Sequence, residues 1–162
     1  MKLIIKFFVK LTWRSYTAFM FYLNGPYGVS ACVEKAPHDL IIYLMRLYGA
    51  QIGDNCNFER GLVLHRPNKK KPFMNFKVGD SVYLGHKMII DLTNQVSIGN
   101  YSAIGAGVQL WTHVGDWSFT RKDEHENRKP IFIKTAVIIY SGCIISPGVT
   151  LESYSRVLAG SV

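Results

Sequence analysis

Histidine is the side chain best suited to move a proton near pH 7, and this sequence contains five. His113 is the most informative of them, because it lies in a charged segment, 111–132, that interrupts a regular apolar pattern. Segments that leave a rigid scaffold and return to it often carry function. A neutral imidazole acts as a general base when an acceptor fixes its tautomer. A base at His113 would need such an acceptor, either a backbone carbonyl or a carboxylate such as Asp116.

Apolar residues recur at every sixth position on both sides of this segment, and small residues often follow them. A period of six fits neither an amphipathic helix nor a hairpin meander. It predicts a parallel β-helix, in which each six-residue unit forms one flat face and its leading aliphatic side chain points into the shaft. The aliphatic positions are Ile98, Ile104, Leu110, Ile133, Ile139, Ile145, Leu151 and Val157.

Several motifs accompany this pattern in a fixed order. Thr112-His113 opens the charged segment, Pro130-Ile131 closes it, and Ser146-Pro147-Gly148-Val149-Thr150 and Ala159-Gly160-Ser161-Val162 follow. Over about residues 46–162 this order resembles the hexapeptide-repeat acetyltransferases, most closely the galactoside and maltose O-acetyltransferases and those of bacterial surface polysaccharides. The resemblance implies a mainly β fold, a left-handed parallel β-helix with N-terminal amphipathic helices and one extended loop.

The same resemblance implies an activity. Acetyl coenzyme A would donate an acetyl group to a sugar hydroxyl of a surface polysaccharide or its precursor, with His113 as the base in a direct transfer. No Ser or Cys here has a nucleophile signature. Ser141 and Ala159 match two positions that contact the cofactor in the family. Gly142 and Gly160 either serve the same close approach or are plain corner residues.

Acceptor-site residues are also implied. Asp91 falls near an acceptor-site aspartate of the galactoside enzyme or is a plain corner residue, and His86 lies near an acceptor-site asparagine. Trp117 and Trp111 either stack on a sugar ring or pack the base of the loop. His65 has no partner at ligand spacing in the sequence, so we expect a structural or surface role for it.

The sequence departs from the family at several corners. Lys134 and Tyr140 replace glycines, and Leu151-Glu152 stands where Ile-Gly is usual. Relatives also continue beyond the position of Val162 with a turn that helps to hold the cofactor. These departures favour an alternative hypothesis, a non-catalytic hexapeptide-repeat scaffold.

A metalloenzyme like the carbonic anhydrases built on the same coil is a third hypothesis. It needs three converging histidines, one pair of them close in sequence. The histidines at 65, 86, 113 and 125 do not show that pair. We therefore expect no metal.

Residues 1–50 form a predicted N-terminal helical segment, and residues 51–162 form the β-helix with its loop at 111–132. Basic residues recur every fourth position from Lys2 to Arg14 opposite Ile4 and Phe8, which predicts a basic amphipathic helix that ends at 24–26. A second helix is predicted over 37–50. The first helix either lies on an anionic membrane or packs on its own coil or a neighbouring subunit; its recurring charges disfavour a membrane span.

The remaining expectations concern partners and location. The formal net charge is +8, yet no nucleic-acid-binding signature is present. The three cysteines have no CxxC pair and no metal spacing, which is typical of free thiols in a reducing cytosol. We therefore expect a cytoplasmic protein, and the basic helix predicts peripheral attachment to the inner face of the cell membrane as the alternative to a freely diffusing one. Flat faces of a thin shaft bury more surface when three copies pack. The resembled family is trimeric and binds coenzyme A between subunits, so the resemblance implies a homotrimer with sites between subunits.

Overall fold

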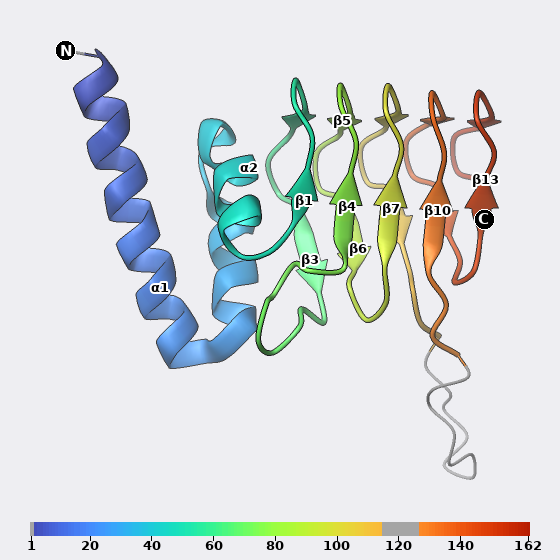
Figure 1. Ribbon diagram of the computed structural model, residues 1–162. Helices are drawn as coiled ribbons and strands as arrows, with labels where there is room; N and C mark the ends of the chain where they lie inside the picture. The colour runs from blue at the N-terminus through green and yellow to red at the C-terminus, as the bar shows by residue number, and fades with distance from the viewer. Residues whose placement is uncertain (1, 115–126) are drawn as a thin grey trace, which may run out of the picture.

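The computed structural model describes residues 2–114 and 127–162. Two helices, α1 (Lys2–Lys35) and α2 (His38–Leu47), precede a series of short strands that begins at Gln51 (Figure 1). Among the described residues, no helix is long and apolar enough to cross a membrane.

The strands form three parallel sheets that the chain visits in turn, so that each circuit makes one coil of a β-helix. The first sheet contains β1 (Gln51–Ile52), β4 (Phe76–Val78), β7 (Val96–Ile98), β10 (Ile131–Ile133) and β13 (Thr150–Leu151). The second contains β2 (Asn57–Phe58), β5 (Tyr83–Leu84), β8 (Ala103–Ile104), β11 (Ile138–Ile139) and β14 (Arg156–Val157). The third contains β3 (Val63–His65), β6 (Ile89–Asp91), β9 (Gln109–Leu110) and β12 (Ile144–Ile145).

The six-residue period explains this winding. Ile98, Ile104 and Leu110 end strands of the first, second and third sheets, and all three are buried in the shaft. Each pairs in register with the equivalent aliphatic residue of the next coil, as Ile98 does with Ile133. Burial of such side chains stabilises the fold by about 1.5–3 kcal/mol each. The predicted fold class, a left-handed parallel β-helix preceded by helices, is confirmed.

The helices cover the first coil. After a bend at Gly25, the second half of α1 packs with α2 against the end of the shaft and buries Val33, Ile41 and Leu44 (Figure 1). The prediction that the first helix ends at 24–26 is wrong in part, because the chain bends there and the helix continues to Lys35. Gly25 has φ 59°, which favours glycine, and the proline that follows it begins a new helical turn, where proline is tolerated. The division of the chain at residue 50 stays a prediction.

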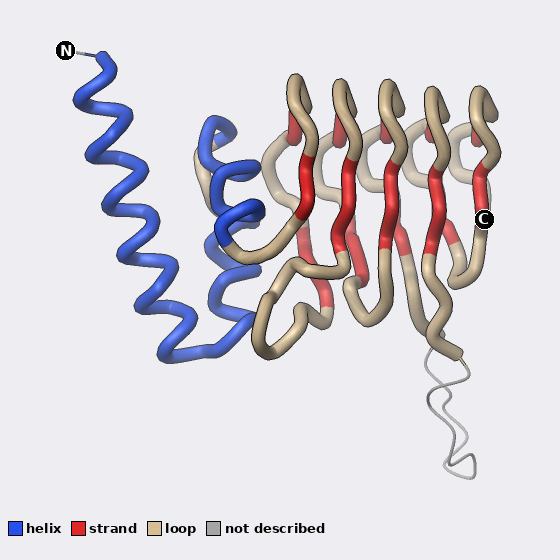
Figure 2. Tube along the Cα trace, in the orientation of Figure 1, coloured by secondary structure: helices blue, strands red, loops and turns tan. Residues whose placement is uncertain are grey.

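One of the three corners contains longer connections than the other two. Connections from the third sheet to the first comprise residues 66–75, 92–95, 111–130 and 146–149, which we call the long-loop corner, and 66–75 and 111–130 are the two long ones (Figure 2). Connections from the second sheet to the third are short turns at 59–62, 85–88, 105–108 and 140–143. Residues 158–161, which follow β14, stack on the last of these turns, and we call the whole set the glycine corner. Each strand of the third sheet therefore runs from the glycine corner to the long-loop corner.

Two corner positions, Lys134 and Tyr140, carry bulky side chains where glycine is usual. Lys134 occupies the column of Gly99, and its ammonium lies 2.6 Å from the carboxylate of Glu152 one coil further on. Both side chains are at least half exposed, so the pair adds little stability. Tyr140 is also exposed. The bulky residues at these corners are thus accommodated because their side chains reach solvent.

Candidate active site

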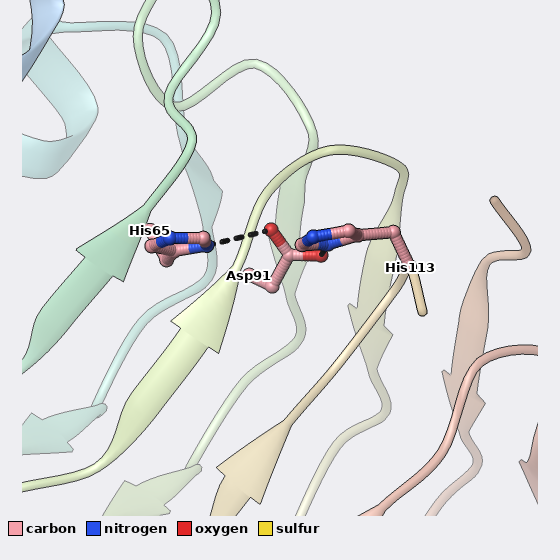
Figure 3. Close-up of side chains that lie close together, drawn as sticks. All are labelled: His65, Asp91 and His113. Carbon is pink, nitrogen blue, oxygen red and sulfur yellow. Dashed lines mark hydrogen bonds and ion pairs between the residues drawn. The ribbon is translucent and has the colours of Figure 1, made fainter. Parts of the chain in front are cut away.

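Three polar side chains meet at the long-loop corner, and each comes from a different coil. His65 ends β3, Asp91 ends β6, and His113 follows β9. Parallel register pairs His65 directly with Asp91, which places their side chains on the same corner. Figure 3 shows the Asp91 carboxylate between the two imidazole rings.

Asp91 is fully buried, and hydrogen bonds satisfy both of its oxygens. Its Oδ2 accepts from the backbone N–H of Thr112 at 3.0 Å, from the hydroxyl of that threonine at 2.6 Å and from Nδ1 of His113 at 2.6 Å. Its Oδ1 accepts from the hydroxyl of Thr93 at 2.8 Å. Burial alone would raise the pKa of Asp91, but the hydrogen bonds from His113, Thr112 and Thr93 outweigh burial and lower it. The carboxylate is therefore ionised at neutral pH.

This carboxylate sets the tautomer of His113. An ionised carboxylate can only accept, so Nδ1 of the neutral ring carries the proton and donates it. Nε2 is then left with a free lone pair, as a general base requires. The side chain of His113 is 12% exposed, which leaves limited access to solvent. Asp91 thus takes the position of the base's acceptor.

His65 approaches the same carboxylate from the other side. Its Nδ1 lies 3.3 Å from Oδ1 of Asp91, and its ring is within 8° of parallel to that of His113, with centroids 5.8 Å apart. Trp111 lies edge-on to both rings, at 5.5 Å and 6.1 Å between centroids. Spacing along the chain did not reveal this contact. Aligning the hexapeptides of successive coils would have done so, because it places residues 65 and 91 side by side.

The ends of the predicted loop are anchored beside the base. Thr112 is buried and its carbonyl accepts from the N–H of Lys129 at 2.9 Å. His113 forms an antiparallel bridge with Arg128. Asp116 and Trp117, predicted for this loop, lie outside the described residues.

The other predicted site residues lie elsewhere. His86 is on the glycine corner, where its side chain is 60% exposed and its Nε2 lies 3.5 Å from a carboxylate oxygen of Glu59. Ser141, Gly142, Ala159 and Gly160 are on the same corner, at the opposite edge of the third sheet from His113. One chain therefore does not bring the predicted base and the predicted cofactor contacts together.

Sequence similarity relates this chain to a curated protein. No protein-family model matches the chain. Nodulation protein L of Rhizobium leguminosarum bv. viciae is 30% identical over an alignment that covers 65% of this chain and 63% of the relative. This chain therefore aligns with less than two thirds of the length of that curated relative.

Solved structures give the fold more directly. A hexapeptide-repeat-containing acetyltransferase from Vibrio cholerae O1 biovar eltor, solved with acetyl coenzyme A, superposes with a TM-score of 0.67 at 20% identity, over 92% of this chain and 74% of that one. A mutant of AntD, an N-acyltransferase from Bacillus cereus solved with dTDP and coenzyme A, gives a TM-score of 0.40 at 14% identity, over 70% and 64% of the two chains. That lower similarity does not establish a shared fold.

This chain has the fold of the hexapeptide-repeat acetyltransferases, so the resemblance stated from the sequence is confirmed for the fold. The galactoside and maltose subtype stays a prediction.

Proposed function

We propose that this protein is an acetyl coenzyme A-dependent O-acetyltransferase, with His113 as the general base and a sugar hydroxyl of a surface polysaccharide or its precursor as the acceptor. The observation that carries the proposal is the 2.6 Å contact between His113 and the buried Asp91 at the long-loop corner. The shared fold supports it, since a structural neighbour is an acetyltransferase solved with acetyl coenzyme A.

The geometry suits direct transfer. Nε2 of His113 takes the hydroxyl proton while the acceptor oxygen forms a bond to the thioester carbonyl carbon. The buried carboxylate of Asp91 stabilises the imidazolium that results, because the charge forms close to it in a poorly solvated site. As the tetrahedral intermediate collapses, the C–S bond breaks and the leaving thiolate takes the proton back from the imidazolium.

The glycine corner fits the coenzyme A arm. A Cβ added at Gly142 or Gly160 would meet no atom within 4 Å, so the backbone there is open to a ligand. Ser141 and Ala159 precede these glycines, are exposed, and are small enough to let an extended amide chain approach. These four residues would hold the pantetheine part of the acyl donor.

The separation of the two corners supports the homotrimer expected from the sequence. His113 and the four cofactor residues lie at opposite edges of the third sheet, so a complete site needs the glycine corner of a second chain beside the long-loop corner of the first. Light scattering at micromolar concentration should give the mass of three chains. A monomer that retained full transfer activity would contradict this assembly.

We also propose that the first half of α1 lies on an anionic membrane. Lys6 is 3.7 Å from Asp39, and Lys10 lies over the ring of Tyr43 at 5.4 Å, so this face turns toward α2. Side chains at helical spacing on the outward face are large, apolar and 47–86% exposed: Ile4, Phe7, Phe8, Leu11, Phe19 and Tyr22. An apolar stripe backed by basic residues is the pattern of an interfacial helix.

A screen of acceptors tests the enzymatic proposal. The full chain is incubated with acetyl coenzyme A and a panel of sugars and lipid-linked sugars, and mass spectrometry detects acetylated product. Transfer that depends on His113 and not on the exposed His38 is the expected result. The alternative is a non-catalytic scaffold, which is favoured by Lys134 and Tyr140, the bulky residues that replace the usual corner glycines. That alternative predicts that wild type and every variant transfer acetyl groups at the background rate only.

A further inference from the structure

We propose that His65, Asp91 and His113 also form a binding site for a divalent transition-metal ion of the zinc type. One ligand atom from each residue lies within 4.8 Å of the other two, and all three residues come from the same chain. Figure 3 shows the carboxylate between the two imidazoles. This proposal goes beyond the proposed transferase function and does not require it.

The general-base role leaves His65 unexplained. A histidine–carboxylate pair needs one imidazole, and His113 fills that place at 2.6 Å from Oδ2 of Asp91. A second imidazole, that of His65, lies 3.3 Å from the other carboxylate oxygen and is not required by that pair. Two imidazoles and one carboxylate are, however, a ligand set that zinc and related ions prefer.

The distances are close to those that a metal ion demands. Zinc lies about 2.0–2.2 Å from nitrogen and oxygen ligands, so two ligands of a tetrahedral ion are roughly 3.3 Å apart. Nδ1 of His65 lies at this distance, 3.3 Å, from Oδ1 of Asp91. Nδ1 of His113 is hydrogen-bonded to the other oxygen, Oδ2, at 2.6 Å, so the imidazole of His113 must rotate away from that oxygen to make room for an ion. One atom from each of the three residues already lies within 4.8 Å of the other two.

Charge and access favour a cation as well. A carboxylate between two imidazoles supplies one anionic and two neutral donor groups to a bound cation. Hydroxyls of Thr93 and Thr112 hold that carboxylate in place, as outer partners of metal ligands commonly do. The side chain of His65 is 40% exposed, which gives an ion a path from solvent.

Metal binding would prevent His113 from acting as a general base. Coordination through Nδ1 of His113 needs the lone pair on that nitrogen, so the proton of the neutral ring must move to Nε2. Nε2 can then no longer accept a proton from an acceptor hydroxyl. Zinc binding and acetyl transfer therefore exclude one another at this corner.

Calorimetry on the tag-free full chain, stripped with EDTA and titrated with zinc chloride near neutral pH, tests the site. We expect one ion per chain with a Kd on the order of micromolar, and His65→Gln should weaken binding by at least about tenfold. His38→Gln removes an exposed histidine outside the cluster, and Cys56→Ser removes the least buried thiol; both should bind as the wild type does.

Thermal unfolding provides a second measurement in case binding heats are small. Zinc at about a hundred times its Kd should raise the melting temperature of the wild type and leave that of His65→Gln unchanged. Binding no tighter than about millimolar, or equal binding by wild type and His65→Gln, would overturn the proposal. One ion per three chains would overturn it too. None of these results depends on whether the chain transfers acetyl groups.

Discussion

Replacement of Asp91 by asparagine probes the base most sharply, because it keeps the shape of the side chain and removes its charge. The carboxylate lies 2.6 Å from Nδ1 of His113, which puts the two charges roughly 4 Å apart when the ring is protonated in the transition state. At an effective dielectric constant of about 20, this attraction is worth about 4 kcal/mol. We therefore expect Asp91→Asn to lower kcat by about a thousandfold, since about 1.4 kcal/mol corresponds to a factor of ten.

The assay is acetyl transfer to the best acceptor of the mass-spectrometric screen, measured as coenzyme A thiol released. Glu59→Gln is the matched control, because Glu59 also lies near a histidine, His86, but on the glycine corner. Circular dichroism checks that Asp91→Asn is folded, since the charged acceptor also contributes about 1.5–3 kcal/mol per hydrogen bond. A folded Asp91→Asn variant that kept more than about a tenth of wild-type kcat would refute the reasoning.

Further expectations concern stability and the membrane. The folded-state pKa of Asp91 lies below its ordinary value of 3.8, so its ionised form contributes stability that is fully present above pH 3.8 and is lost as the pH falls through the folded value. In urea unfolding, the free energy of unfolding of wild type should therefore exceed that of Asp91→Asn by a large amount at pH 7 and by less toward pH 2. A Cβ at Gly99 would lie 2.7 Å from the carbonyl carbon of Lys134, so Gly99→Ala should lower the free energy of unfolding by about 1–3 kcal/mol, and a change within about 0.5 kcal/mol would argue against this packing. Paired Phe7→Ser and Leu11→Ser replacements on the outward stripe of α1 should abolish flotation with anionic liposomes, whereas Tyr154→Ser, an exposed aromatic on the β-helix, should leave it intact; equal flotation by all variants would place the contact elsewhere.

The fold was predictable from the sequence because its signal repeats. Each coil reuses the same six-residue spacing, so Ile98, Ile104 and Leu110 report the same geometry as their partners one coil further on. The bend at Gly25 was harder to predict. A Gly-Pro pair marks a break, but whether helix resumes after it depends on the apolar surface of the first coil, which buries Val33.

The site was predictable only in part, because it depends on contacts between coils. His113 could be singled out by its place in an interrupted pattern. Its partner could not, because Asp91 is 22 residues away and the sequence offered the nearer Asp116 as an alternative. His65 was missed for the same reason: the loops of the long-loop corner differ in length, so residues that lie side by side have no fixed spacing along the chain.

The central claim is that a single imidazole, held by a buried carboxylate, removes the acceptor proton. The most direct measurement is the rate of acetyl transfer by the full-length wild type and by His113→Ala, each at saturating acetyl coenzyme A with the same acceptor, and with His38→Ala as the control. We predict that His113→Ala loses at least about a thousandfold in kcat while still binding the cofactor, and that His38→Ala matches the wild type. Equal rates for the wild type and His113→Ala would contradict the account.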